Sequence, residues 1–290
     1  MNEPHKYAVR TQARAKINLL LRILARESSG YHQIETVFQL LDLADDVAVT
    51  RTAGGVQLDV QGPDLGPVTE NLAVRAAELV LEVTGRKFGV AIELTKRIPV
   101  RAGLGGGSSD AAAVLHAVNA LADNAVPPHE LMQLGTRLGA DVAFFASGAP
   151  AALAWGRGER LFRLTAPPQA PVLIAVPALS VSTPDAYGWW DEMHPNPAAR
   201  GPVVLDAEAF RSWGSIGRLG GNDFEVPVFS RHPPLRVVFE QLAATGPLWV
   251  RLCGSGAAVA AVYRSPRDRD DAAQTLNVKV ATPILTTTMP

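Results

Sequence analysis

Residues 99–110 read PVRAGLGGGSSD, and an alanine-rich pattern with helical spacing follows directly, from Ser109 to Ala122. Four of the five positions from Gly103 to Gly107 are glycine. Glycine permits positive φ and close approach of the backbone to a ligand, and a helix N-terminus offers unpaired N–H groups. A loop that merely starts a helix is the alternative, but one or two glycines suffice for such a turn. The segment therefore favours an anion site, with phosphate as the natural ligand.

Three familiar motifs for binding phosphate or metal do not match this sequence. A Walker A loop needs Gly-Lys followed by Ser or Thr, and the chain contains no Gly-Lys dipeptide. The dinucleotide fingerprint that starts at Gly103 needs glycine at position 108, where Ser108 stands. The zinc-protease pattern fails because Gln133 replaces the second histidine after His129 and Glu130.

Composition sets wider limits. The 290 residues include 27 Lys and Arg against 28 Asp and Glu, a formal net charge of −1, so we expect no nucleic-acid partner and no anionic membrane surface. With 47% hydrophobic and 19% charged residues, the chain can bury a core. Cys253 is the single cysteine, which excludes an intramolecular disulfide. The first residues do not resemble a signal peptide, and a cytoplasmic protein is expected.

Periodicity predicts the first elements of the chain. Residues 15–24 alternate as a half-buried strand, with Lys16 and Asn18 on the polar face, where a solvated surface is the ordinary interpretation. Residues 71–83 have helical spacing, with Thr69 as a possible N-cap and Gly85 as a stop. The Ser-Ser-Asp sequence at 108–110 is expected to cap the helix over 109–122.

A further helix is expected over 129–138, with Asp141 just beyond it as either a turn former or a functional carboxylate. Short strands follow at 152–156 and 172–179, then a Pro/Gly-rich loop at 194–202, a helix at 235–244 and an apolar strand pair near Cys253. These elements predict an α+β protein. We expect two domains, an N-terminal one over 1–160 and a C-terminal one over 161–290.

Taken together, the motifs identify a known family. The resemblance rests on four segments: ARAKINLLL at 13–21, GYHQIETVFQLLDLADDV at 30–47, PVRAGLGGGSSDAAAVL at 99–115 and RLCGSGAAVAAVY at 251–263. The shorter motifs LGADVAFF and GNDFE add to it. The chain resembles the GHMP small-molecule kinases. Within them it is most similar to the members that act on a cytidine diphosphate-linked methylerythritol.

This resemblance implies a fold and a reaction. The implied fold joins an N-terminal domain like the second domain of ribosomal protein S5 to a ferredoxin-like C-terminal domain, with the active site in the cleft between them. The implied reaction is ATP- and Mg²⁺-dependent transfer of the γ-phosphoryl group to the 2-hydroxyl of 4-diphosphocytidyl-2-C-methyl-D-erythritol. That step belongs to non-mevalonate isoprenoid synthesis.

The family pattern also implies roles for individual residues. Lys16 and Asp141 match its catalytic pair. Asn18, Tyr31, His32, Thr183 and Tyr187 match its substrate contacts, and Tyr31 with His32 match the pair that binds the cytosine base. ATP is expected on the following residues: Pro99, Val100, Arg101, Ala102, Gly103, Leu104, Gly105, Gly106, Gly107, Ser108 and Ser109. A carboxylate can take the alcohol proton during phosphoryl transfer, which suits Asp141.

Two alternatives remain open from the sequence. The glycine-rich loop alone also suits a GHMP kinase that acts on a mevalonate-like or homoserine-like alcohol. The second alternative is a nucleotide-binding homologue that has lost catalysis. Such a protein would be expected to lose Lys16 and Asp141 first, and both are present. The Mg²⁺ ligands and the choice between monomer and homodimer are left open.

Overall fold

The computed structural model describes residues 7–195, 205–219 and 221–290, so most of the predicted 194–202 loop lies outside the described residues. The chain is α+β, as expected, and forms two compact units. Unit 1 contains the residues up to Ala15, Leu43–Val100 and Gly105–Ala149, and unit 2 contains Lys16–Asp42, Arg101–Leu104 and Pro150–Pro290. Two long strands, β1 (Ala8–Arg26) and β2 (His32–Thr52), contribute residues to both units.

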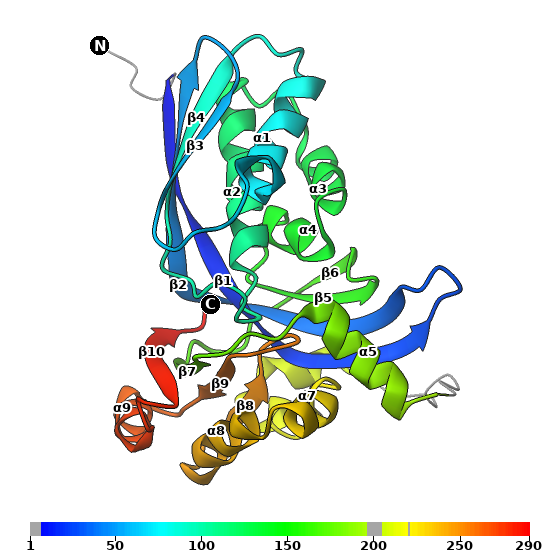
Figure 1. Cartoon of the computed structure of the whole chain (residues 1–290), viewed down its shortest axis with the longest axis vertical. Coiled ribbons are helices and arrows are strands. Elements are labelled where there is room, and N and C mark those ends of the chain that lie inside the picture. The colour runs from blue at the N-terminus through cyan, green and yellow to red at the C-terminus, as the bar shows by residue number, and fades with distance from the viewer. Residues whose placement is uncertain (1–6, 196–204, 220) are drawn as a thin grey trace. The chain divides into compact units, whose positions relative to one another are not determined.

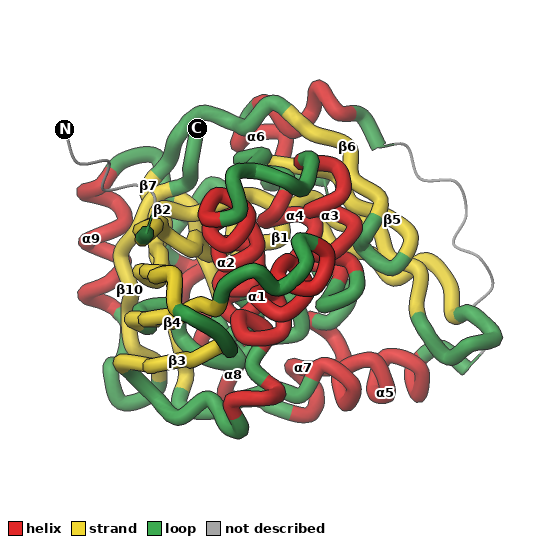
Figure 2. The backbone as a smooth tube through the Cα atoms, turned by 90° about the horizontal axis from the view of Figure 1, so that it is seen from above, coloured by secondary structure: helices red, strands yellow, loops and turns green. Residues whose placement is uncertain are grey.

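Unit 1 packs helices against a sheet. Strand β4 (Gly89–Thr95) pairs parallel to β3 (Val56–Gln61) and antiparallel to residues 46–52 of β2. The helices are α1 (Leu72–Val83), α2 (Gly106–Leu121), α3 (Pro128–Thr136) and α4 (Ala140–Ala146), and they gather on one side of these strands (Figure 1). Seen from above, α1 to α4 form one group (Figure 2). Aliphatic side chains from both layers form the core of this unit.

Two helix starts differ from the sequence expectation. The N-cap of α1 is Asn71, whose side chain accepts the Ala73 N–H at 2.9 Å, whereas Thr69 lies in a separate 3₁₀ turn, η2 (Val68–Glu70). Helix α2 begins at Gly106 rather than at the Ser-Ser-Asp sequence, because Gly105 takes φ 75° and turns the chain into the helix. Ser108 and Ser109 therefore lie inside the first turns of α2.

Unit 2 contains a four-stranded antiparallel sheet in the order β10-β7-β9-β8. Its strands are β7 (Pro171–Pro177), β8 (Trp249–Leu252), β9 (Val259–Val262) and β10 (Ala281–Thr287). Helix α8 (Pro233–Ala244) connects β7 to β8, and α9 (Pro266–Thr275) connects β9 to β10. This β-α-β-β-α-β order is the ferredoxin-like arrangement, which confirms the expectation for the C-terminal part.

The remaining elements of unit 2 extend β2 and cover the ferredoxin-like sheet. Residues 34–39 of β2 pair with β5 (Ala151–Gly156), which pairs with β6 (Arg160–Leu164). Between β7 and α8 lie α5 (Thr183–Met193), η3 (Ala207–Arg211), α6 (Trp213–Ile216) and α7 (Glu225–Arg231). Trp190, Phe224 and Val228 from α5 and the α7 region join the core of unit 2.

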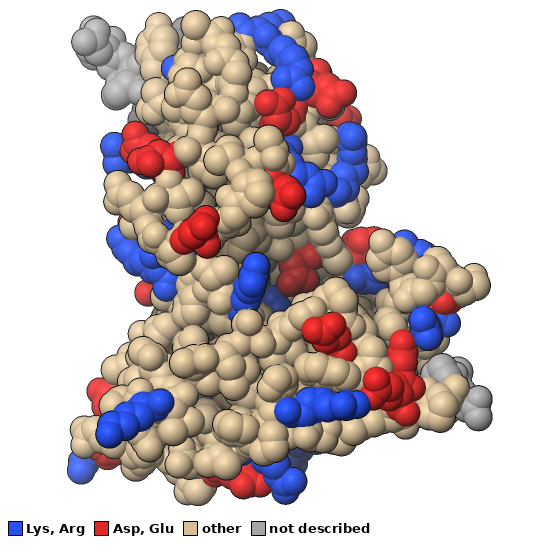
Figure 3. Space-filling view, in the orientation of Figure 1, with Lys and Arg blue, Asp and Glu red and all other residues tan. Residues whose placement is uncertain are grey.

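The strand predicted over 15–24 is confirmed as part of β1, but the ordinary interpretation of its polar face as solvated does not hold for Lys16 and Asn18. Lys16 is 4% and Asn18 2% exposed. Elsewhere, Lys, Arg, Asp and Glu are interspersed on the face drawn in Figure 3, as the near-zero net charge suggests. Among the described residues, no helix has the length and apolar character needed to span a membrane.

Candidate functional site

The glycine-rich segment begins helix α2 in the way expected of an anion site. Gly105 precedes the helix in the left-handed conformation, and no side chain caps the first turn. The Ser109 N–H donates to the Gly105 carbonyl at 2.9 Å, so the N–H groups of the residues between them have no carbonyl one turn earlier in the helix to donate to. These groups and the helix dipole favour phosphate at the start of α2.

The middle of the same segment belongs to unit 2, where a close backbone contact fixes it. Gly103 has φ 78°, and a Cβ there would lie 1.8 Å from the Cys253 carbonyl oxygen, so only glycine fits. The Ala258 N–H donates to the Ala102 carbonyl at 3.2 Å, and the Lys16 N–H donates to the Leu104 carbonyl at 2.9 Å. Three motifs far apart in sequence therefore meet at residues 102–104.

Cys253 takes part in this contact through its backbone. Its side chain is fully buried, and burial raises the pKa of the thiol to about 12. A thiol with that pKa stays protonated and is a poor nucleophile near neutral pH. The cysteine therefore serves packing rather than chemistry.

Lys16 and Asn18 form one end of a buried hydrogen-bond chain in unit 2. The Lys16 Nζ donates to Asn18 Oδ1 at 2.8 Å, and Asn18 Nδ2 donates to Thr36 Oγ1 at 2.8 Å. Thr36 Oγ1 in turn donates to the Leu20 carbonyl at 2.7 Å. The lysine ammonium also lies 5.4 Å from the centroid of the Phe38 ring. Burying a charged group costs free energy, and the hydrogen bond to Asn18 offsets part of that cost. The same bond fixes the direction of the ammonium.

Gly254 lies directly beside this lysine. A Cβ added at Gly254 would approach Lys16 Nζ at 3.5 Å and the Gly103 carbonyl oxygen at 3.2 Å. Asn222 holds the same turn, because its Nδ2 donates to the Leu252 and Gly254 carbonyls at 2.9 and 2.6 Å. The catalytic lysine predicted from the sequence is thus surrounded by backbone from two glycine motifs.

His32 and Tyr187, both predicted to contact substrate, are brought together in unit 2. Their rings stack with centroids 4.4 Å apart and planes 14° from parallel. His32 Nε2 lies 2.8 Å from Asp191 Oδ1, and the Trp190 ring meets the imidazole edge-on at 5.9 Å. Sequence reasoning missed Asp191, although it lies one helical turn after Tyr187 on α5 and so shares its face.

Tyr31 has different surroundings from its neighbour His32. Its side chain is 59% exposed, and the Arg157 guanidinium lies 4.1 Å from the ring centroid. Arg157 is held by Glu27, and this hydrogen-bonded pairing lowers the pKa of the Glu27 carboxyl. Tyr31 therefore presents an aromatic surface next to a fixed cation, a contact that the sequence did not predict.

Thr183, at the start of α5, has a partner in the third glycine motif. Its hydroxyl lies 2.8 Å from the hydroxyl of Ser255. The contact ties the first turn of α5 to the 253–258 turn within unit 2. Of the predicted substrate residues, Asn18, His32, Thr183 and Tyr187 all make such defined contacts.

Asp141 belongs to unit 1, where it lies in the first turn of α4 rather than in a turn. An acidic residue at that position is favoured by the helix dipole. Helix α4 packs closely on α3: a Cβ added at Gly135 would lie only 3.3 Å from the Val142 side chain. The carboxylate is thus carried by a short helix whose position is fixed by this tight contact.

The described residues contain no group of three or more His, Cys, Asp and Glu side chains arranged to hold a metal ion. A magnesium ion commonly keeps several waters and binds substrate phosphates together with one or two carboxylates.

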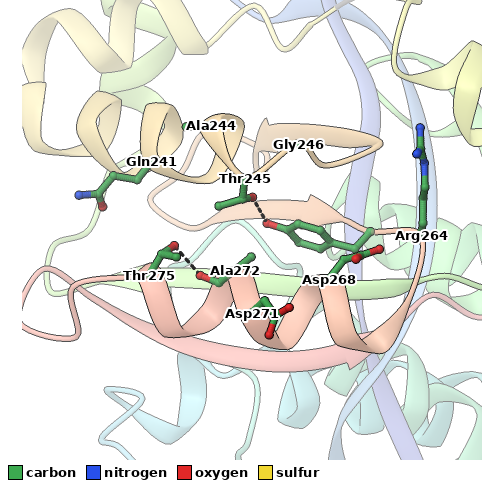
Figure 4. Close-up of a pocket in the computed structure, with 10 residues that line it drawn as sticks. Gln241, Ala244, Thr245, Gly246, Arg264, Asp268, Asp271, Ala272 and Thr275 are labelled. Atoms are coloured by element: carbon green, nitrogen blue, oxygen red, sulfur yellow. Dashed lines mark hydrogen bonds between the residues drawn. The ribbon is translucent and has the colours of Figure 1, made fainter.

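A separate pocket of about 660 Å³ lies in unit 2 between the end of α8 and α9 (Figure 4). Two of its lining residues, Tyr263 and Thr245, have their hydroxyls 2.8 Å apart, and Asp268 and Asp271 line it from α9. None of the residues predicted from the sequence lines this pocket. The candidate functional site is therefore distinct from the pocket in Figure 4.

Protein-family comparison agrees with the glycine motifs and the fold. Residues 71–149 match the model of the GHMP kinases N terminal domain, and residues 206–280 match that of the GHMP kinases C terminal. The fold and site thus define the class as GHMP kinase. A mevalonate kinase from L. major shares this fold, with a TM-score of 0.73 over 100% of this chain and 99% of that chain at 15% identity.

Individual relatives narrow the class. A 4-diphosphocytidyl-2-C-methyl-D-erythritol kinase from Chlorobaculum tepidum is 37% identical over 268 residues, which cover 92% of this chain and 93% of the relative. A crystal structure of 4-(cytidine 5'-diphospho)-2C-methyl-D-erythritol kinase has a TM-score of 0.82 at 37% identity, over 97% of this chain and 100% of that chain. The chain belongs to the 4-diphosphocytidyl-2-C-methyl-D-erythritol kinase family of GHMP kinases.

Proposed function

We propose that the protein transfers the γ-phosphoryl group of ATP to the 2-hydroxyl of 4-diphosphocytidyl-2-C-methyl-D-erythritol, giving the 2-phosphate and ADP in non-mevalonate isoprenoid synthesis. The observation that carries this proposal is the convergence of Lys16, the 102–104 backbone and the 253–258 turn. A buried, oriented ammonium beside a glycine-rich phosphate loop is what stabilisation of a transferring phosphoryl group requires. Family membership supports the substrate.

Residues 99–109 are proposed to hold ATP. The N–H groups at the start of α2 would take the phosphates, and the glycines would admit them close to the backbone. Mg²⁺, when bound, neutralises charge on the phosphate oxygens, and its protein ligands are left open. No further cofactor is included in the proposal.

Asp141 is proposed as the general base and Lys16 as the cation that stabilises the transferring group. The base would accept the proton of the 2-hydroxyl as that oxygen attacks the γ-phosphorus, while the bond from the γ-phosphorus to ADP breaks. Asn18 orients Lys16 through the 2.8 Å hydrogen bond and would also contact the substrate. Lys16 belongs to unit 2 and Asp141 to unit 1.

Tyr31, His32, Thr183 and Tyr187 are proposed to bind the cytidine part. Tyr31 and Tyr187 offer aromatic faces for a pyrimidine, and His32 offers ring nitrogens for hydrogen bonds to its edge. The stacked His32 and Tyr187 rings support this assignment because they place a planar polar group and a planar aromatic one together. A kinase for a small acyclic alcohol has no need of such a group.

The proposed setting is a cytoplasmic enzyme, monomeric or homodimeric, without nucleic-acid or membrane partners. The functional domains are proposed to be residues 1–160 and 161–290. Both statements rest on composition and on family resemblance.

The test is turnover by the purified chain with ATP, Mg²⁺ and 4-diphosphocytidyl-2-C-methyl-D-erythritol, with phosphorus NMR to locate the new phosphate. We expect ADP and the 2-phosphate in equal amounts. Tyr31→Ala should raise the KM for the cytidyl substrate while the KM for ATP stays within about twofold. A folded protein that binds both ligands without turnover would instead identify a non-catalytic homologue.

A further inference from the structure

A second buried lysine, Lys96, lies in unit 1 and takes no part in the reaction proposed above. It directly follows β4, and its side chain is 4% exposed. Its ammonium donates to Asp45 Oδ2 and, at 2.6 Å, to Asp110 Oδ2. The Asp45 and Asp110 side chains are 0% and 3% exposed. We call these three residues the Lys96 cluster.

The Lys96 cluster is joined to both ends of the glycine-rich segment. Asp45 Oδ1 accepts the N–H groups of Arg97 and Ile98, at 2.5 and 2.8 Å, directly before that segment begins. Asp110 is the last residue of that segment and lies within α2. A Cβ at Gly106, the first residue of α2, would lie 3.4 Å from the Lys96 Nζ. The ammonium thus lies against the first turn of the helix.

The charges of the Lys96 cluster do not balance. Two ionised carboxylates and one ammonium leave one surplus negative charge in a buried place. Asp110 Oδ1 is buried and has no hydrogen-bond partner among the described residues. Burial raises the pKa of Asp110 to about 7; Lys96 opposes this rise and Asp45 adds to it. A proton on Asp110 removes the surplus charge.

We propose that the Lys96 cluster positions the first turn of α2 for the nucleotide, and that nucleotide phosphates bind together with a proton on Asp110. The inference rests on the proposed function, since it takes the start of α2 as the phosphate site. A surplus negative charge near that turn repels phosphate, whereas a neutral cluster leaves the helix dipole unopposed. The neutral form should therefore bind nucleotide more tightly.

Other charged groups near α2 do not explain this coupling. The helices packed against α2 carry the following charged or titratable residues: Arg75, Glu78 and Glu82 on α1, His129 and Glu130 on α3, and Asp141 on α4. Among the described residues, Asp110 forms its ion pair with Lys96, and the side chains that shift its pKa are Lys96 and Asp45. The surplus charge is consequently a property of Lys96, Asp45 and Asp110.

Proton uptake measured by calorimetry tests the proposal. ADP with Mg²⁺ is titrated into the full chain at pH 7 in two buffers of different ionisation enthalpy, for wild type, Asp110→Asn and Asp46→Asn. Asp46 is the matched control, since it is the exposed neighbour of Asp45 and pairs with Arg97 at the surface. On binding ADP, the wild type and Asp46→Asn should each take up more protons than Asp110→Asn, by about half a proton per chain at most.

Equal proton uptake by wild type and Asp110→Asn would overturn the proposal. Absence of ADP and ATP binding by the wild type from pH 6 to 8 would instead remove the proposed function, so the two failures are distinguishable. Where the wild type binds nucleotide, the Asp46→Asn variant shows whether a surface charge change alone alters the proton uptake.

Lys96 variants test the positioning role. Lys96→Met should raise the KM for ATP about tenfold and change kcat at saturating ATP by less than about threefold, and Lys96→Arg should restore most of the loss. An unchanged KM for ATP in folded Lys96→Met contradicts the role. If Lys96→Met does not fold, the proton uptake of Asp110→Asn and the KM for ATP of Lys96→Arg still test the proposal. Both variants keep a cation beside Asp45.

Discussion

In unit 1, the backbone groups proposed to hold phosphate lie within five consecutive positions, from Gly105 to Ser109. In unit 2, by contrast, His32 meets Asp191 from 159 positions away, and Thr183 meets Ser255 from 72 positions away. The first arrangement follows from local glycine and helix chemistry, whereas the second exists only once the ferredoxin-like part has folded. The proposed nucleotide side should therefore tolerate distant changes better than the proposed cytidine side.

The largest expected effect is on chemistry. Asp141→Asn should lower kcat by about 10²–10⁴-fold, the usual scale for a general base, while the KM for ATP is largely kept. Asp123→Asn is the matched control, since Asp123 is exposed and its φ of 57° suits asparagine. Near-normal turnover of Asp141→Asn would show that another group accepts the proton.

The next effect concerns the long-range contact at residue 103. Gly103→Ala should lower the free energy of unfolding by about 3 kcal/mol, because its Cβ would overlap the Cys253 carbonyl. Gly107→Ala meets no atom within 4 Å and should instead stabilise α2 by about 0.5–1 kcal/mol. Denaturant unfolding measures both, and equal stability of the two variants would contradict the close contact.

A pH-dependent effect separates the Lys96 cluster from the rest of unit 1. Asp110 has a pKa of 3.8 when unperturbed and about 7 in the fold, so the folded chain holds this proton where the unfolded chain has lost it. Its contribution to the free energy of unfolding should fall as pH rises from about 4 to 7 and then level off. Asp110→Asn should lack this fall. The measurement is the difference in free energy of unfolding between the wild type and Asp110→Asn, taken from denaturant curves at pH 5, 6, 7 and 8.

The smallest effect falls on the cytidine side. Asp191→Asn should raise the KM for the cytidyl substrate about tenfold with little change in kcat, because the hydrogen bond that orients the His32 ring is weakened. Asp185→Asn, exposed on the same helix, is the control. A rise in the KM for ATP of the same size would mean that Asp191 acts on the fold rather than on the substrate.

The same contrast explains what the sequence could predict. Glycine spacing predicted the phosphate loop, alternation predicted β1 and helical spacing predicted α1, because those signals lie within a few residues of one another. They missed the N-cap Asn71 and the early start of α2 at Gly106, where the conformation of the preceding Gly105 decides the boundary. Alternation alone could not show that Lys16 and Asn18 are buried, because their hydrogen-bond chain continues to Thr36, which lies on another strand.

Family resemblance supplied what local patterns lacked. Tyr187 was predicted only through the family motif, and its stacking on His32 became visible only in the fold. Asp45, within β2, and Lys96, directly after β4, escaped notice because a charged residue in or next to a strand ordinarily faces solvent. Neither residue has a local signal for burial, since Asp45 lies 51 positions from Lys96, and Asp110, the other partner of Lys96, lies 14 positions from it.

Substrate choice tests the central claim most directly. The purified chain is given ATP, Mg²⁺ and, in parallel, 4-diphosphocytidyl-2-C-methyl-D-erythritol, mevalonate or homoserine, and kcat/KM is measured for each. The account predicts that kcat/KM for the cytidyl compound exceeds the others by at least about 10³-fold, because only that compound can use the His32 and Tyr187 rings. Equal or faster turnover of mevalonate or homoserine would contradict it.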